Sequence, residues 1–433
     1  MLRFWLPLLS LTCFSLLAAC AAPSPSPAPL PDLVGDWRAV LASPGGELPF
    51  TLRVRQEGDG LTAVAVNGRE EAPFSAVAVD GRQVEFAIDV YDAEISAQVS
   101  EDGSSLTGRW RKTIPDGDST LPFAATRDDV RRFLPLAEAG LAPGAAEAPG
   151  AESVAGTWAV EFREVPVDPE SAAEPARAEF NQSGDTVRGT FLTPTGDYRY
   201  LAGTYQEGLL RLSTFDGAHA FLFEARVLED GTLAGEFWSR DSYHARWSAE
   251  RSDDVALPDA WSQVGLTNDD GTLEFTFPNL AGDPVSLSDE RFVGKVVLVN
   301  VFGTWCPNCN DEAPLLAQWH REYRRQGFEV VGLAYEFSGD PERDGEQVRR
   351  FAERYGIEYP LLLAGISDKA AAGETLPDLT AVLSYPTTIF IGRNGKVRRI
   401  HSGFTGPGTG EHFDELIAEQ TALIEELLAE ETS

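Results

Sequence analysis

Residues 294–316 read "GKVVLVNVFGTWCPNCNDEAPLL" and join a continuous apolar run to two closely spaced cysteines. A run rich in Val and Leu is typical of a strand that is buried on both faces of a sheet. Pro307 suits the first turn of a helix, where its missing N–H costs no hydrogen bond. The stretch therefore predicts a buried strand that passes directly into a helix, with Cys306 at or near the helix N-terminus.

The spacing of the two cysteines is that of a redox pair. The exposed N–H groups and the dipole of a helix N-terminus favour an anion, so a thiolate at Cys306 is stabilised there. Cys309 follows three residues later and lies one turn away on the same helix face. It can therefore attack a mixed disulfide at Cys306 and release the bound partner. We expect Cys306 to be the nucleophile and Cys309 the resolving cysteine.

Other roles for this pair fit the sequence less well. A structural zinc site needs four nitrogen or sulfur ligands, and none of the five histidines forms a local pair that completes a tetrahedron. Copper-delivery proteins of the Sco type space their cysteines by three residues, and a peroxiredoxin has Thr or Ser where this chain has Gly303. A purely structural disulfide across four residues constrains the unfolded chain little. We expect redox catalysis and no bound metal.

The segments after residue 271 alternate between strand and helix patterns. A βαβ crossover is expected to precede a ββα unit, which makes this an α/β domain. The expected elements are strands at 328–335 and 359–363, a helix at 346–355, a hairpin around Asn394-Gly395 and a final amphipathic helix from 413 to 428.

These motifs, together with "YPTTIFIGRNGKV" at 385–397, resemble the TlpA/ResA-like thiol–disulfide oxidoreductases of the thioredoxin superfamily. The resemblance covers roughly residues 270–430 and implies a thioredoxin-like fold. It implies that Pro386 is cis and faces the cysteines, which exposes the backbone of Tyr385 for a substrate peptide. It also implies that Glu312 takes the proton from Cys309; the alternative is that Glu312 is merely a surface residue of the helix.

Three further residues are candidates beside the pair. Trp305 is expected to shield the disulfide and contact substrate, with simple packing as the alternative. Pro307 and Asn308, between the cysteines, are expected to tune the redox potential. The redox-active disulfide Cys306–Cys309 is then the whole chemistry, and we expect no other cofactor.

The N-terminus carries an export pattern. Arg3 is followed by an apolar run over residues 4–19 that is short for a bilayer span and suits a signal peptide (1–19). The sequence Leu-Ala-Ala-Cys at 17–20 resembles the lipobox of bacterial lipoproteins, which implies a lipidated Cys20. A Pro/Ser tether (20–31) follows. Ala21 after the cysteine resembles outer-membrane sorting.

Two β modules are expected between the tether and the α/β domain. Short alternating segments separated by Gly, Asp or Asn fill residues 32–128, and the same pattern recurs over 153–252. Each is expected to be a small antiparallel barrel or sandwich. Linkers at 129–152 and 253–270 separate these modules from each other and from the thioredoxin-like domain at 271–433.

The two modules share a faint resemblance to the calycin (lipocalin-like) pattern. Trp37 aligns with Trp158 near the start of each module, and Arg127 aligns with Arg251 near the end. In calycins the cation of the last strand lies over the indole of the first strand. The alternative interpretation is that these tryptophans simply belong to the core.

The acidic composition narrows the function. A formal net charge of −33 over 433 residues argues against nucleic acid, because phosphates require clusters of Lys and Arg. We expect a lipid-anchored cell-envelope enzyme that faces the periplasm, with the outer membrane favoured, and exchanges disulfides with exported proteins and an envelope electron donor. The alternative is a ligand- or partner-binding lipoprotein in which the β modules carry the main function and the thioredoxin-like domain is accessory.

Overall fold

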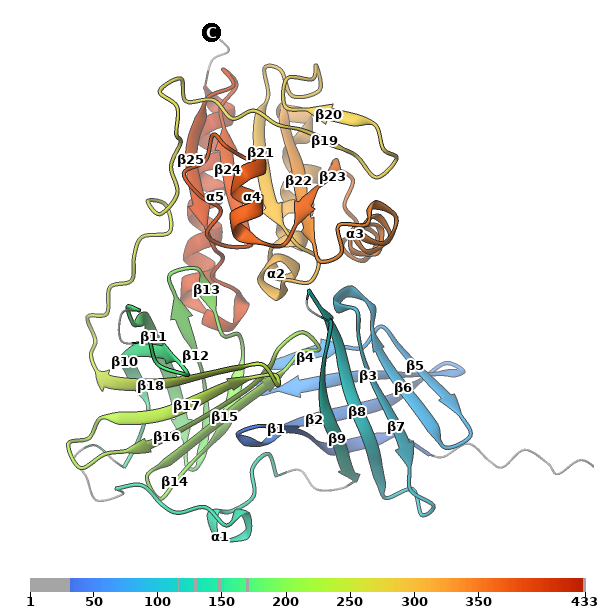
Figure 1. The fold of residues 1–433 in the computed structure, drawn as a ribbon, viewed down its shortest axis with the longest axis vertical. Coiled ribbons are helices and arrows are strands. Elements are labelled where there is room, and N and C mark those ends of the chain that lie inside the picture. Colours follow the sequence, from blue (N-terminus) through green and yellow to red (C-terminus); the bar gives the residue numbers. More distant parts are fainter. Residues whose placement is uncertain are drawn as a thin grey trace, which may run out of the picture.

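The computed structural model describes residues 32–115, 117–127, 131–145, 150, 152–168 and 171–430. Two β modules lie side by side, and an α/β unit sits across the ends of both (Figure 1). The proposed signal peptide, the tether and Cys20 lie outside the described residues. None of the helices in the described ranges has the length and apolar character needed to cross a bilayer.

The first module is a curled antiparallel sheet of nine strands in the order β4-β3-β2-β1-β9-β8-β7-β6-β5. Alternate residues face the core, as the period-2 pattern predicts. Among the described strands, β3 and β5 approach each other but no ladder joins them, so the sheet stays open. Its elements are β1 (Gly35–Ser43), β2 (Gly46–Glu57), β3 (Gly60–Asn67), β4 (Glu70–Pro73), β5 (Ala76–Asp80), β6 (Gln83–Ile88), η1 (Asp89–Tyr91), β7 (Ala93–Val99), β8 (Ser105–Ile114) and β9 (Gly117–Arg127).

The second module closes into a barrel because β11 pairs with both β10 and β12. Its interior is filled by aromatic rings such as Phe162, Phe191, Phe223 and Phe237, so the barrel is a packed core. Its strands are β10 (Gly156–Glu164), β11 (Glu174–Ser183), β12 (Thr186–Thr193), β13 (Gly196–Asp197), β14 (Leu201–Gln206), β15 (Leu209–Phe215), β16 (Ala220–Val227), β17 (Leu233–Ser239) and β18 (Tyr243–Arg251).

The expected contact between the first and last strands is present in both modules. The Arg127 guanidinium lies 4.4 Å from the ring centroid of Trp37, and Arg251 lies 4.3 Å from that of Trp158. The two tryptophans are also buried, so the core and cation–π interpretations hold together.

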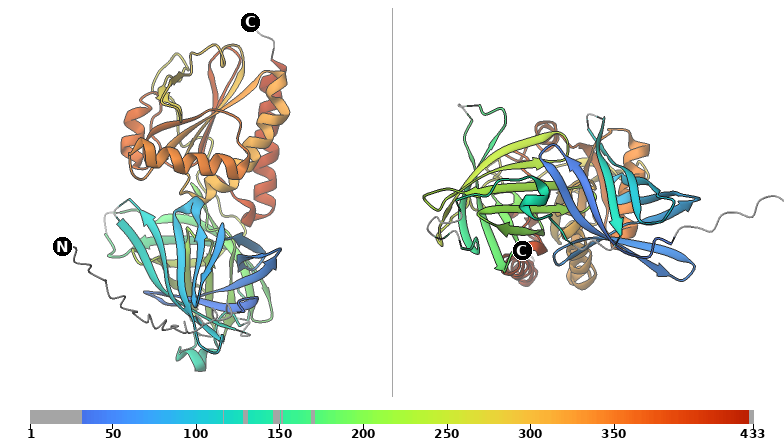
Figure 2. Two further views of the ribbon diagram at one scale, coloured as in Figure 1. Left: turned by 90° about the vertical axis from the view of Figure 1, so that its right-hand side faces the viewer. Right: turned by 90° about the horizontal axis from the view of Figure 1, so that it is seen from below.

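The α/β unit has a five-stranded sheet in the order β23-β22-β21-β24-β25. Strands β23, β22 and β21 are parallel, β24 is antiparallel to β21, and β25 is antiparallel to β24. This confirms the βαβ and ββα expectation. Helices cover both faces of the sheet (Figure 2). The elements are β19 (Thr276–Pro278), β20 (Pro284–Ser286), β21 (Val296–Phe302), α2 (Pro307–Tyr323), η2 (Arg324–Gln326), β22 (Phe328–Glu336), α3 (Pro341–Tyr355), β23 (Leu361–Ile366), α4 (Lys369–Thr375), β24 (Thr387–Ile391), β25 (Val397–Ser402), η3 (Pro407–Thr409) and α5 (Glu411–Ala429).

The segment between the β modules is packed against both of them where it is described. It contains the short helix α1 (Leu136–Ala139), and the side chains of Phe133 and Leu136 are buried. Arg132 donates hydrogen bonds to the carbonyl of Val66 in the first module and to the carbonyl of Ser213 in the second. This segment therefore helps to hold the two modules together.

Candidate active site

The cysteine pair lies where the buried strand β21 gives way to helix α2. Cys306 is the N-cap of α2, and Pro307 occupies the first helical position. The Cys309 N–H donates to the Cys306 Sγ at 3.4 Å, which directs a backbone donor at this sulfur. Both thiols are free, with 6% and 2% of the residue surface exposed for Cys306 and Cys309. The predicted position at the helix N-terminus is confirmed.

The loop that faces Cys306 carries the predicted cis proline. The peptide bond between Tyr385 and Pro386 is cis, and the Cys306 thiol donates to the Tyr385 carbonyl at 3.3 Å. Trp305 lies beside this loop, with its ring 5.4 Å from that of Tyr385 and its indole N–H donating to the Tyr335 carbonyl at 2.8 Å. Trp305 therefore packs against the loop that faces Cys306.

Glu312 lies beneath the pair and is only 1% exposed, so the alternative of a surface residue is excluded. Asn300 Nδ2 and Thr388 Oγ1 each donate to its carboxylate at 2.7 Å. Burial raises the pKa of Glu312 to about 7. Burial, and then the neighbouring Cys306 sulfur, raise the pKa of Cys309 well above its usual value, and the Glu312 charge adds to this. A nearby base is therefore needed to ionise Cys309.

Most residues that were predicted for the site converge on it. The structure brings together Trp305, Cys306, Pro307, Asn308, Cys309, Glu312, Tyr385 and Pro386. Asn308 turns its amide to the Phe404 carbonyl at 3.1 Å, so it braces the helix start. The roles of these residues in tuning and substrate binding remain predictions.

Asn300 and Thr388 were missed by the sequence reasoning although they hold Glu312. Asn300 was visible as the one polar residue within the apolar run that forms β21. A polar side chain in a fully buried strand requires a hydrogen-bond partner, and this signal points to a buried polar site.

Arg199 of the second β module was also missed, and it ties that module to α2. This buried side chain, between β13 and β14, pairs with Asp311 of α2 and with Asp216 at 3.0 Å and Glu70 at 2.5 Å. Burial raises the pKa of Asp311 to about 7 although Arg199 acts to lower it, and the negative charges of Asp197 and Glu70 add to the increase. Its partners are far apart in sequence, so no local pattern marks it.

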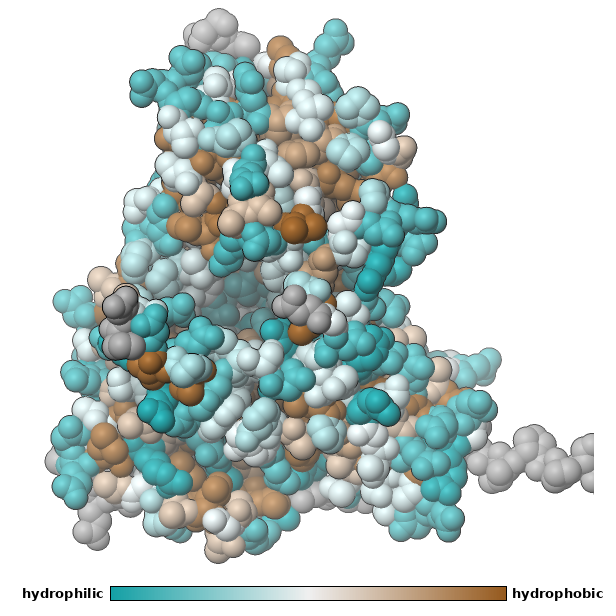
Figure 3. All heavy atoms as spheres, in the orientation of Figure 1, coloured by the Kyte–Doolittle hydropathy of each residue, from teal (hydrophilic) through white to brown (hydrophobic). Residues whose placement is uncertain are grey.

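A cavity of about 480 Å³ lies between the end of the barrel and the start of α2. The molecule is hollowed between its upper and lower parts in Figure 3. The cavity's lining from the α/β unit is Trp305, Cys306, Pro307, Asn308 and Tyr385. Its lining from the second β module is Phe162, Glu174, Pro175, Thr193, Pro194, Thr195, Gly196, Asp197, Tyr198, His219 and Phe221.

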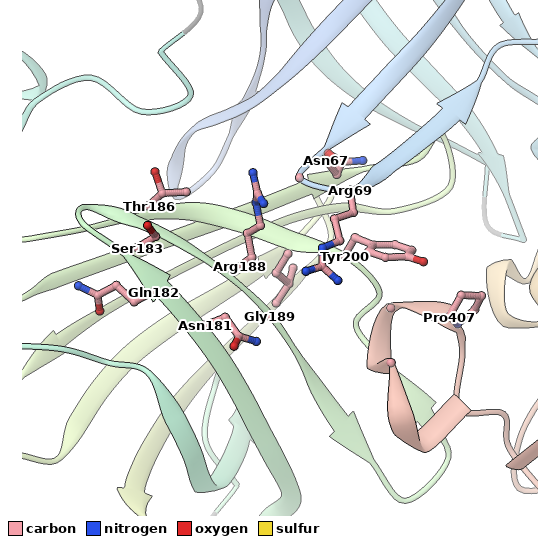
Figure 4. Close-up of a pocket in the computed structure, with 14 residues that line it drawn as sticks. Asn67, Arg69, Asn181, Gln182, Ser183, Thr186, Arg188, Gly189, Tyr200 and Pro407 are labelled. Atoms are coloured by element: carbon pink, nitrogen blue, oxygen red, sulfur yellow. The ribbon is translucent and has the colours of Figure 1, made fainter. Parts of the chain in front are cut away.

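A second cavity, of about 470 Å³, lies where the two β modules meet the loop before α5 (Figure 4). Arg69, Arg188, Tyr200 and Pro407 are among its lining residues, which do not include either cysteine of the pair. The cavity that touches Cys306 is therefore the candidate active-site pocket.

A dithiol at a helix N-terminus, opposite a cis-proline loop on a mixed sheet, defines a thioredoxin-like redox domain. A family model described as the AhpC/TSA family matches residues 269–400. The thiol-disulfide oxidoreductase ResA of Halalkalibacterium halodurans is 32% identical over 145 residues, which is 34% of this chain and 74% of the relative. The thioredoxin-like protein YneN of Bacillus subtilis is 31% identical, over 33% of this chain and 75% of the relative.

Two solved structures are similar to part of this chain. A putative thiol:disulfide interchange protein DsbE from Chlorobium tepidum is 25% identical and covers 34% of this chain and 95% of its own, with a TM-score of 0.26. A DsbF homologue from Corynebacterium diphtheriae is 22% identical and covers 40% and 99%, with a TM-score of 0.29. Through its C-terminal domain, the chain belongs to the ResA-like family of thiol–disulfide oxidoreductases.

Proposed function

We propose that this protein is a cell-envelope thiol–disulfide oxidoreductase that reduces or exchanges disulfides in exported proteins. The observation that carries the proposal is the free pair Cys306 and Cys309 at the start of α2, with Cys306 against the Tyr385 carbonyl and Glu312 buried below. The chemistry uses the two sulfurs and needs no further cofactor.

In the first step the Cys306 thiolate attacks one sulfur of a substrate disulfide. The substrate S–S bond breaks, and the leaving sulfur departs with the electron pair and takes up a proton. A mixed disulfide then joins Cys306 to the substrate. The Cys309 N–H is directed at the Cys306 sulfur and stabilises its negative charge before attack.

In the second step Cys309 releases the substrate. Its thiol gives a proton to the Glu312 carboxylate, and the resulting thiolate attacks the Cys306 Sγ. The mixed disulfide breaks, and the second substrate sulfur leaves and takes up a proton. Two electrons pass from the protein dithiol to the substrate, which becomes two thiols. An envelope dithiol donor restores the pair.

The proposed location rests on the N-terminal sequence. An export signal and a lipid on Cys20 would hold the enzyme on a membrane, facing the periplasm, where exported proteins carry disulfides. The outer membrane is favoured by Ala21. Replacement of Cys20 by Ser is expected to abolish incorporation of labelled fatty acid and to move the protein from the membrane to the soluble fraction.

Single-turnover kinetics test the chemistry. We expect Cys306→Ser to lose all reaction with a peptide disulfide, and Cys309→Ser to stop at a stable mixed disulfide that mass spectrometry detects. Glu312→Gln should slow the release step by about 10²-fold, which is the usual contribution of a general base. The release rate of the native protein should rise with pH up to about 7 and then level off, because the ionised Glu312 is the acceptor.

The matched control is Glu322→Gln, which alters an exposed carboxylate on the same helix. It should leave the release rate and its pH profile unchanged. If Glu312→Gln keeps the native profile, the carboxylate is structural and another group accepts the proton. If Cys306→Ser retains turnover, the proposed function is wrong.

A further inference from the structure

We propose that the second β module forms one wall of the substrate site, so that the cysteine pair acts on short, extended, cysteine-containing polypeptide segments that are apolar and carry no net negative charge. This inference rests on the proposed function and deepens it by naming the substrate class. Disulfides on the surface of folded domains are excluded by the same wall.

The face of the α/β unit that carries the cysteines is docked onto the barrel. Asp197 accepts from the Gly406 N–H at 2.7 Å, and the ion pair of Arg199 with Asp311 lies one turn into α2. The barrel hairpin comes so close that a Cβ on Gly196 would lie 2.4 Å from the Asn308 amide nitrogen. The barrel therefore stands directly over the start of α2, and Cys306 faces the cavity that remains.

The size of this cavity limits what can enter. Its volume of about 480 Å³ lies within the range of small-ligand pockets, roughly 300–1,000 Å³. A stable interface with a folded partner needs about 800 Å² of flat or complementary surface on each side. The cavity thus accommodates a few residues of an extended chain or a small disulfide, while the barrel wall keeps a folded surface away from Cys306.

The lining favours an apolar segment. Aromatic rings and prolines dominate it, among them Phe162, Tyr198, Phe221 and Trp305. The Tyr385 carbonyl, which accepts the Cys306 thiol, supplies the backbone group beside which an extended segment can lie. Such surfaces bind side chains by burial of apolar area.

The charged groups of the lining disfavour anions. Asp197 is held by the N–H groups of Gly406 and Arg199, and His219 is paired with Asp216 at 3.0 Å. Glu174 lies at the start of β11 and is exposed, and its carboxylate forms no ion pair or hydrogen bond with any residue in the described ranges. Its free carboxylate, on a chain with a net charge of −33, makes the potential at the entrance negative.

Four disulfides separate the outcomes in stopped-flow experiments with the reduced full chain. They are 2-hydroxyethyl disulfide, the disulfide-linked dimers of acetyl-Phe-Cys-Lys-amide and of acetyl-Phe-Cys-Glu-amide, and folded insulin. We expect the Lys peptide to react about tenfold faster than the Glu peptide at low salt, with the ratio falling towards one as salt screens the charge. Insulin should react at least tenfold more slowly than the Lys peptide.

Glu174→Lys should reverse the preference between the two peptides. Glu250→Lys, which makes the same charge change on an exposed residue of the barrel that does not line the cavity, should keep the native preference. Equal rates for both peptides and insulin, unaffected by Glu174→Lys, would overturn the inference while reaction with 2-hydroxyethyl disulfide upholds the redox function. Failure to react with any of the four disulfides would overturn both.

Discussion

The two β modules share a sequence pattern and the same cation–π contact between their first and last strands, yet only the second module closes into a barrel. In each, an arginine of the last strand lies over the tryptophan of the first, and the two residues are opposite partners in the strand ladder. In the second module β12 pairs with β14, and the barrel is complete. In the first module the corresponding strands β3 and β5 have no ladder between them.

The first module stays open because the β15–β16 hairpin of the second module packs into its core. Phe215, at the end of β15, stacks on Phe50 with ring centroids 4.5 Å apart and meets Trp110 edge-on at 5.7 Å. Asn67, at the end of β3, exchanges two hydrogen bonds with the backbone of Phe215, at 2.8 and 3.1 Å. The hairpin thus provides backbone and side-chain contacts that a closed barrel would make internally.

This difference shows that the repeated modules are parts of one structure. The buried core of the first module is continuous with the β15–β16 hairpin and with the core of the α/β unit, whereas the barrel core is separate. The open module therefore depends on its neighbours for stability, while the closed module can hold its own shape.

Phe215→Ala tests this dependence most strongly. Removing the ring leaves a cavity in the core of the first module and should cost about 4 kcal/mol of its stability. Hydrogen exchange should accelerate in β2 and β3, far from the substitution in sequence. Phe223→Ala is the control, because this buried ring stacks inside the barrel on Phe237 at 4.2 Å.

The control should cost a similar free energy but accelerate exchange in the barrel strands instead. Should Phe215→Ala leave β2 and β3 protected, the hairpin is a passive contact and the first module is stable alone.

The α/β domain was predictable because its signals are local. Strand and helix periods, and two cysteines three residues apart, identify the elements and the redox pair without knowledge of distant contacts. The position of Glu312 followed from the family resemblance. The helix expected from residue 346 begins earlier, at Pro341, because Asp340 caps it by accepting from the Glu342 N–H at 2.9 Å.

The arrangement of the β modules was not predictable, since it depends on residues far apart in the chain. The alternating pattern of β3 is the same whether or not it finds a partner in β5, so periodicity does not reveal closure. Asn67 and Phe215 are 148 residues apart, and Arg199 and Asp311 are 112 apart. The wall over the active site is made by such pairs, which is why the sequence suggested separate modules.

A buried lysine gives the open module a pH dependence that the barrel lacks at the matching position. That position is Arg240, which follows Trp238 by two residues as Lys112 follows Trp110. Lys112 is 2% exposed, and burial, with a contribution from Arg240, lowers its pKa to about 7. Between pH 7 and 9 the native side chain is neutral while the unfolded one is still protonated. The unfolded state then binds more protons, so stability rises with pH in this window.

Lys112→Met should remove this dependence. Relative to the variant, the native protein should gain about 2 kcal/mol of unfolding free energy between pH 7 and 9, as chemical denaturation at each pH would show. Arg109→Met is the matched control, because it removes an exposed cation from the same strand, β8, and leaves both Lys112 and Arg240 in place. It should retain the rise. If the difference in unfolding free energy between the native protein and Lys112→Met does not change with pH, Lys112 keeps its proton when buried.

The smallest expected effect concerns the cation–π contact between the first and last strands of each module. Among the described strands, β1–β9 is the only ladder that joins the two halves of the open sheet, whereas the barrel is also held by the β12–β14 ladder. Arg127→Met and Arg251→Met should each cost about 1 kcal/mol, since each removes one cation–π contact. Loss of the contact should destabilise the β1–β9 ladder more than the β10–β18 ladder, because only the barrel is also closed by a second ladder. Hydrogen exchange would show the difference, with Arg109→Met on the exposed face of β8 as the control. Equal acceleration in both ladders would mean that the inserted hairpin joins the halves of the open sheet as firmly as a continuous ladder does.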